Sequence, residues 1–371
     1  TTTHSSNSLR KGPVLIHRVS SKISETYLPT SPTSTMVPLN SCSDTQVMTQ
    51  LKQKAGEGKT DNELLWSLIF IAAKWKGRLR SHGGFSDPHG PESAIVDLLL
   101  RDAPEDDSSV IDLPQHKGAC TSDGSSASLK KVQDYLLRGQ REEAVSSALS
   151  SKNYALALLL ASMCSDSTYQ TVARRFADEA LHIGSPLHTV ATLFSQPSDD
   201  VSGSTFDFWN GSSENLHKTW RYHLSTILSN QTAGWKKIVV SLGDQLLSIG
   251  YTCAAHFCYI VSGSSLASKS DPSARLVLVG CDHSLSQHVA LLTPQGLEGY
   301  KRTEAFEWSK RKGNPHATVA VFQPFKLRYA MLLADHGFDK DAKMYVDSIR
   351  KCTGLDSIDN SQPIKKVKKP S

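Results

Sequence analysis

The sequence predicts an all-α protein, an irregular helical solenoid that folds back on itself and is preceded by a short β-prone segment. Over residues 220–351, apolar residues recur at steps of three and four, the spacing that marks one face of a helix. Gly or Asn stands where each run stops, as is typical of helix ends. The loops between the runs differ widely in length, which argues against a regular tetratricopeptide or HEAT array.

Residues 1–43 differ from the rest of the chain. The stretches GPVLIHRVS (12–20), ETYLP (25–29) and STMVPLN (34–40) are β-prone, carry no helical period and are separated by Ser, Thr and Pro. Three strands of this length could form a small antiparallel sheet, but its area is too small for a core of its own. The segment is therefore either an incomplete sheet or a disordered leader of β-prone composition.

Residues 44–351 form the predicted helical domain, in which Gly250 is expected to end a helix. Residues 103–128 are rich in Ser, Gly, Asp and Pro and predict a disordered insertion within this domain. The short run LVLVG at 276–280 is compatible with a strand or with a helix. Residues 352–371 contain a run of lysines and predict a basic, disordered linker.

Composition limits the classes of partner. The chain has a net charge of +5 but no basic stripe interleaved with aromatic residues, so we expect no nucleic-acid binding. No apolar run is long enough to span a bilayer, so we expect no direct membrane insertion. The chain begins without Met and without an apolar leader, which indicates a piece of a longer protein that is not directed to secretion.

The sequence offers little for chemistry. Seven scattered cysteines favour free thiols in a reducing compartment, and the motifs GxGxxG, GxxxxGK[ST], GxSxG and HExxH do not occur. The best metal-like group is Cys253, His256 and Cys258. Five steps along a helix turn it by about 500°, so these side chains do not share one face. We therefore expect buried thiols and a hydrogen-bonded histidine there, no cofactor and no enzymatic activity.

One segment carries a family signature. Residues 220–263, WRYHLSTILSNQTAGWKKIVVSLGDQLLSIGYTCAAHFCYIVSG, resemble the central conserved domain of the Sec-sixteen proteins, which are scaffolds of endoplasmic-reticulum exit sites. Further matches are LVLVGCDHS at 276–284, RTEAFEW at 302–308 and LADHG at 333–337. The resemblance implies that the motif residues pack the helices together, and these are Trp220, Leu224, Asn230, Gly243, Asp244, Ala255, His256, Cys258 and Tyr259.

The resemblance also implies a fold and a partner. Its fold is the ancestral coatomer element, in which the helical chain doubles back as a trunk, a crown and a tail. Residues 1–43 are then a β-blade that completes the open propeller of the Sec-thirteen protein in trans, which would explain a sheet too small to stand alone. The residues expected to contact the propeller are Val14, Leu15, Ile16, His17, Arg18, Val19, Tyr27, Leu28, Met36 and Val37.

The function implied is a non-enzymatic scaffold that organises COPII coat assembly at the cytosolic face of the reticulum. Family members self-associate, giving a two-plus-two complex with the propeller, and other coat proteins are expected to bind through flanking regions. Two alternatives stay open: another coatomer-element protein, either the outer-coat helical subunit or a nucleoporin, and an enzyme or metalloprotein built around Cys253, His256 and Cys258.

Overall fold

The computed structural model describes residues 37–81, 87–101, 122–182, 185–195, 216–232, 234–283 and 293–353. Within these ranges the chain is helical and contains no strand, so the predicted all-helical class is confirmed. None of the helices in the described ranges combines the length and the apolar character that crossing a bilayer requires.

The described helices follow one another in the order η1 (Leu39–Ser41), α2 (Asp44–Ala55), α3 (Asp61–Lys74), α4 (Pro91–Leu100), α6 (Ser122–Leu137), α7 (Arg141–Ser150), α8 (Tyr154–Ala161), α9 (Asp166–Ala180), α10 (Pro186–Phe194), α11 (Leu216–Ser229), α12 (Trp235–Ser248), α13 (Thr252–Ser262), α15 (Pro294–Arg311), η3 (Ala320–Phe322), α16 (Gln323–Asp335) and α17 (Asp339–Thr353).

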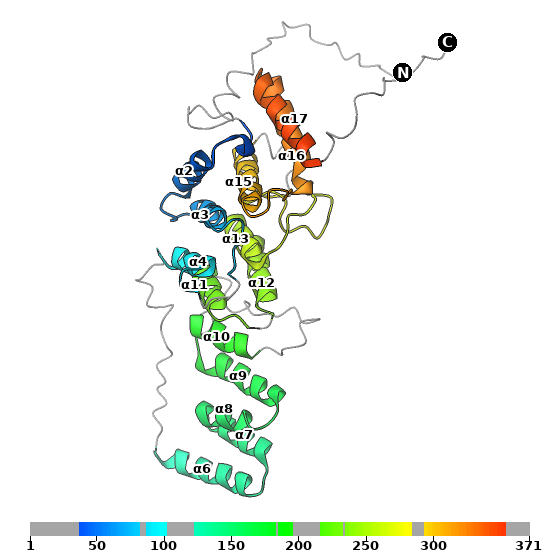
Figure 1. Ribbon diagram of the computed structural model, residues 1–371. Helices are drawn as coiled ribbons and strands as arrows, with labels where there is room; N and C mark the ends of the chain where they lie inside the picture. Colours follow the sequence, from blue (N-terminus) through cyan, green and yellow to red (C-terminus); the bar gives the residue numbers. More distant parts are fainter. Residues whose placement is uncertain are drawn as a thin grey trace, which may run out of the picture.

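The helices stack into an elongated body (Figure 1). Helices α6 to α10 form a column at one end, and α16 and α17 form the other end. Helix α3 packs against α13 and α15, and α4 packs against α11, although these partners lie far apart in the sequence. The chain therefore doubles back, and its N-terminal helices lie beside the middle of its C-terminal half.

Sequence signals account for the helix ends. Ser43 and Gln46 form a capping box at the start of α2, and Thr60 and Glu63 form another at the start of α3. After α12, Gly250 adopts φ of +87°, a left-handed conformation that costs glycine little, so the expected helix end at this residue is confirmed.

The apolar interior is divided into clusters. The largest contains Trp220 of α11 and Phe257 of α13, whose rings meet edge to face at 5.7 Å. A second cluster joins α15, α16 and α17 around Tyr300 and Tyr329, and a third joins α6 to α9. Helix α15 lies between the first two clusters, because Phe306 belongs to one and Tyr300 to the other. It is consequently buried on most of its faces.

Several boundaries differ from those predicted. Residues Leu39–Ser41, assigned to the β-prone segment, form a 3₁₀ helix, because the Leu39 side chain packs on the main core instead of extending a strand. Helix α6 begins at Ser122, inside the predicted insertion 103–128, since Ser and Asp suit the first turn of a helix. Residues 276–280 form bends and turns, neither strand nor helix, and α17 continues to Thr353, two residues into the predicted linker.

Candidate partner-binding site

The N-terminal segment is attached to α15 at two points. The backbone N–H of Leu39 donates a hydrogen bond to Glu304 Oε1 at 3.3 Å. Five residues later, Asp44 forms an ion pair with Lys312, the residue that follows α15. Eight residues separate the two partners along the helix, a rise of about 12 Å. The segment is thus laid along α15, and it ends where α2 begins.

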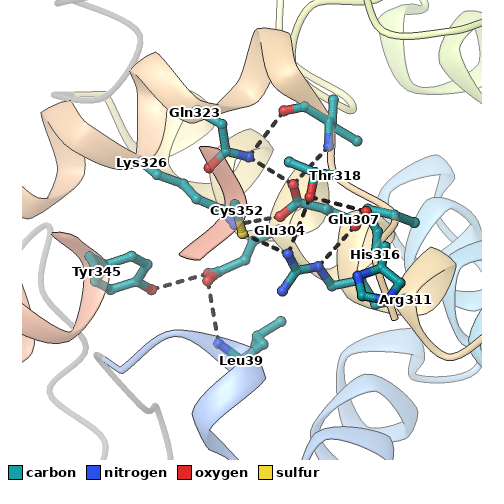
Figure 2. Close-up of polar contacts among 12 residues, drawn as sticks. Leu39, Glu304, Glu307, Arg311, His316, Thr318, Gln323, Lys326, Tyr345 and Cys352 are labelled. Carbon is teal, nitrogen blue, oxygen red and sulfur yellow. Dashed lines mark hydrogen bonds and ion pairs between the residues drawn. The ribbon is translucent and has the colours of Figure 1, made fainter. Parts of the chain in front are cut away.

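Glu304 lies at the centre of this attachment (Figure 2). Its second oxygen, Oε2, accepts a hydrogen bond at 3.1 Å from the Tyr345 hydroxyl of α17, so one carboxyl joins η1, α15 and α17. Burial raises the pKa of Glu304 to about 7, although the nearby Lys326 charge acts in the opposite direction. The Glu304 carboxyl therefore titrates near neutral pH.

One turn further along α15, Glu307 forms a buried ion pair with Lys326 of α16 (Figure 2). The two side chains are 2% and 1% exposed. Glu307 Oε1 also accepts hydrogen bonds from the Val319 N–H at 3.0 Å and from Gln323 Nε2 at 2.9 Å. The buried Glu307 carboxylate is stable in the interior because Lys326 pairs its charge and two donors form hydrogen bonds to its oxygen.

A hollow of about 420 Å³ lies next to the attachment, between η1, the end of α15 and the end of α17. Arg311 extends along it and donates to the Ala317 carbonyl at 2.9 Å and to Cys352 Sγ at 2.6 Å. The hollow is bordered by Asn40, near the start of the described chain, and by Cys352, near its end. Its other lining residues are Ser41, Pro315, Met344, Asp347, Ser348 and Lys351.

Most of the residues predicted to contact a propeller lie outside the described residues. These are Val14, Leu15, Ile16, His17, Arg18, Val19, Tyr27, Leu28 and Met36. Val37 is described, and it is half-buried in a bend just before η1. The structure therefore shows where residues 37–44 lie, beside α15 and α17, and the blade itself stays a prediction.

The motif residues on α11 lie in the core or at its edge. Trp220 and Leu224 are fully buried. Asn230 lies just after α11, where its side-chain amide donates to the Thr226 carbonyl at 3.0 Å on the exposed surface. These residues fix the helix and its end.

The motif residues on α12 and α13 pack the two helices against each other. Gly243 faces the Tyr259 ring so closely that an added Cβ would lie 2.5 Å from Cε1. The Tyr259 hydroxyl donates to Asp244 Oδ1 at 2.7 Å, and Arg275 binds both oxygens of the same carboxylate at 2.7 and 3.0 Å. This arrangement lets the helices approach closely and attaches the loop after α13 to α12.

The metal-like residues are used in packing and hydrogen bonding. His256 Nδ1 accepts the Gly280 N–H at 2.8 Å, and burial lowers the His256 pKa to about 3, so the ring is neutral. Cys258 and Ala255 are fully buried, and burial raises the pKa of the Cys258 thiol and of Cys253. Among the described residues, no group of three or more His, Cys, Asp or Glu side chains is placed to hold a metal.

Glu304, Glu307, Lys312 and Lys326 were not among the residues predicted from the sequence to form a site. A signal was present for the first two, because RTEAFEW places two acids three residues apart on a helix that is otherwise flanked by apolar residues. Buried acids of this kind need partners, and the partners come from η1, α16 and α17.

A comparison with family models gives one match. The family described as "Sec16 Sec23-binding domain" matches residues 132–364, more than half of the chain.

Curated relatives agree with this match. "Protein transport protein SEC16B homolog" of Arabidopsis thaliana is 32% identical over 314 residues, which is 78% of this chain and 22% of that protein. "Protein transport protein Sec16B" of Mus musculus is 29% identical over 329 residues, 82% of this chain and 30% of that protein. "COPII coat assembly protein sec16" of Aspergillus oryzae is 28% identical over 330 residues, 81% and 18%. The chain thus spans less than a third of each of these relatives.

Among solved structures, "Sec13/Sec16 complex, S.cerevisiae" matches with a TM-score of 0.58 at 17% identity, covering 89% of this chain and 84% of that chain. At this identity the likeness shows a shared fold. Since the family model covers most of the helical domain and relatives from a plant, a mammal and a fungus align over about four fifths of the chain, this protein belongs to the Sec-sixteen family and comprises its central conserved domain.

Proposed function

We propose that this domain is a non-enzymatic scaffold that organises COPII coat assembly at endoplasmic-reticulum exit sites, on the cytosolic face of the membrane. The family match carries this proposal, together with relatives whose names describe protein transport and COPII coat assembly. The same match favours an exit-site scaffold over the outer-coat subunit and over a nucleoporin. Stacked helices that present an extended surface suit such a role.

The partner in this proposal is the Sec-thirteen propeller, which the predicted blade of residues 1–43 completes. Because Leu39–Ser41 form a 3₁₀ helix, residues 1–36 are the part proposed to insert. Support comes from the β-prone stretches at 12–20 and 25–29, which cannot form a core alone, and from the printed name of the solved complex. The third stretch, 34–40, ends in a bend and a 3₁₀ helix. Strand addition supplies main-chain hydrogen bonds, and Val14 and Ile16 lie two residues apart, so both point to the same face of a strand. Affinity then depends on the whole blade, because one hydrogen bond contributes about 1 kcal/mol.

The deletion of residues 1–36 tests the partner. The intact chain and the truncated chain are each mixed with purified propeller and analysed by gel filtration with light scattering. We expect the intact chain to co-elute with the propeller and the truncated chain to elute alone, with its helical circular dichroism unchanged. Co-elution of the truncated chain would remove the blade from the interface.

A pair of single substitutions sharpens the test. Ile16→Glu places a charge on the face of the predicted strand that packs, whereas Ser8→Glu adds the same charge before the first β-prone stretch. We expect only Ile16→Glu to weaken propeller binding. The mass from light scattering also tests the proposed self-association, since a two-plus-two complex has twice the mass of a one-to-one complex.

The family description adds a second candidate partner, Sec23, and other coat proteins are proposed to bind through regions that flank this chain. Immobilised domain incubated with purified Sec23 would retain it if the helical domain itself carries this activity. Retention only by a longer chain would assign the contact to the flanks.

A further inference from the structure

We infer that residues 38–44 are a rigid brace that fixes the direction in which the N-terminal blade leaves the helical domain, with Glu304 and Lys312 as its positioning residues. The inference rests on the proposed function, and it adds a geometric role: the bound propeller is held at a set angle to α15. The connection between the blade and the helical domain would then be rigid, and the helical domain would orient its partner as well as bind it.

Hydrogen bonds and one proline restrict the backbone of the brace. Pro38 is buried and its ring limits φ, which is −55°. The Ser41 N–H donates to the Pro38 carbonyl at 2.8 Å, and the Cys42 N–H donates to the Leu39 carbonyl at 3.2 Å. Ser43 is already the N-cap of α2. A turn of 3₁₀ helix is therefore joined to α2 by two extended residues, Cys42 and Ser43, and the capping box between Ser43 and Gln46 holds the second of them.

Two anchors hold the brace on α15, and they differ in character. Leu39 donates its N–H to the buried Glu304, and its side chain packs against the main apolar cluster. Asp44 and Lys312 form an ion pair at the surface. Two separated points of attachment prevent rotation about either one, whereas a single point would leave a swivel.

Glu304 suits the inner anchor in either protonation state. Its Oε1 accepts the Leu39 N–H, and its Oε2 lies 3.1 Å from the Tyr345 hydroxyl. A protonated carboxyl keeps an acceptor for Leu39 and can share its proton with Tyr345, so the contact between η1, α15 and α17 survives a change of charge.

The experiment compares distance distributions in the complex of the full chain with the propeller. One spin label is placed at Ser146, an exposed residue of α7, by an unnatural amino acid, and the other on the propeller. Variants are Glu304→Leu, which removes the acceptor, Glu304→Gln, which keeps it, and Lys312→Met at the surface. We expect Glu304→Leu to broaden the distribution about twofold and to change the propeller affinity by less than about threefold, since the blade is intact. We expect Glu304→Gln to retain the wild-type width.

An unchanged width in both Glu304→Leu and Lys312→Met would overturn the brace. Lys312→Met also covers the case in which Glu304→Leu fails to fold, because its ion pair lies outside the core. If the propeller binds neither the wild type nor any variant, the proposed function fails. The brace is then tested by measuring hydrogen exchange of the free chain. There the Leu39 amide should exchange about tenfold faster in Glu304→Leu than in Glu304→Gln, and equal rates would refute the inference.

Discussion

The buried ion pair between Glu307 and Lys326 gives the sharpest prediction. Replacing Lys326 by Met preserves most of the side-chain volume and removes the cation that faces Glu307 Oε2. Glu307 then retains its hydrogen bonds from the Val319 N–H and from Gln323 Nε2, but its charge is unpaired in a site where its side chain is 2% exposed. Removing one partner of such a pair costs about 3–5 kcal/mol.

The second substitution, Glu307→Gln, separates the charge from the rest of the site. In the double variant, the new amide at position 307 offers a neutral carbonyl to the same two donors, and the thioether at position 326 faces an uncharged group. We therefore expect the double variant to lose only about 1 kcal/mol, because a buried pair replaced by neutral groups of similar volume is often nearly neutral. Glu307→Gln alone leaves Lys326 as an unpaired buried cation and should also cost about 3–5 kcal/mol. The coupling free energy from the cycle is then about 5–9 kcal/mol.

The assay is chemical denaturation near neutral pH, followed by circular dichroism, with hydrogen exchange of the α15–α17 amides to place the change. Both single variants should unfold at lower denaturant than the double variant. A Lys326→Met variant as stable as the wild type, or additive effects of the two substitutions, would show that solvent reaches the pair and would refute the burial argument.

Three further outcomes follow from contacts described above. Gly243→Ala should lower the free energy of unfolding by about 1–3 kcal/mol, because its Cβ would lie 2.5 Å from the Tyr259 ring. The double variant with Tyr259→Leu should lose less stability than the sum of the two single variants, and additive losses in denaturation would contradict this packing. Burial lowers the pKa values of His223 and His256 from 6.5 to about 3, so below about pH 6.5 the unfolded chain binds more protons than the folded chain. The free energy of unfolding should therefore fall as the pH drops from 6.5 toward 3, by up to about 1.4 kcal/mol per pH unit for each histidine. A His223→Gln variant whose melting temperature falls with acid as steeply as that of the wild type would exclude His223 as a cause. Glu304 acts in the opposite direction, because its pKa is raised from 4.5 to about 7 and the folded state keeps the proton to a higher pH than the unfolded state. The free energy of unfolding is therefore lost as the pH rises between about 5 and 7, and Glu304→Gln should reduce this loss. An unchanged pH dependence would place the pKa of Glu304 outside this range.

The helical part of the fold was predictable from local signals. Apolar spacing gives the faces that pack, and Gly250 marks a helix end because a left-handed residue stops α12 there. The motif residues were found by resemblance, and their packing is local to α11, α12 and α13, which are consecutive in the chain. Packing between consecutive helices can be predicted from the sequence, since the apolar face of each helix, which packs against the next, appears as a periodic pattern.

The attachment of the N-terminal segment was not predictable in the same way. Leu39 meets Glu304 only after the chain has doubled back, across 265 residues. Locally, STMVPLN favours extended backbone, and the 3₁₀ turn forms because tertiary packing of Leu39 overrides that preference. The composition of residues 122–128 also gave a wrong prediction, because Ser and Gly are weak helix formers, yet α6 begins at Ser122.

The residues that identify the family and the residues proposed to bind its partner therefore occupy different parts of the molecule. Most of the signature on α11 to α13 is buried, and Tyr259 of α13 contacts Gly243 and Asp244 of α12. The proposed interface begins before Val37 and reaches the helices through Leu39 and Asp44. Substitutions in the two regions should then separate experimentally: Gly243→Ala lowers stability and affects binding only through the folded fraction, whereas Ile16→Glu removes binding from a domain that melts like the wild type. A loss of stability from Ile16→Glu equal to that from Gly243→Ala would mean that the leader is part of the helical core and would withdraw the blade proposal.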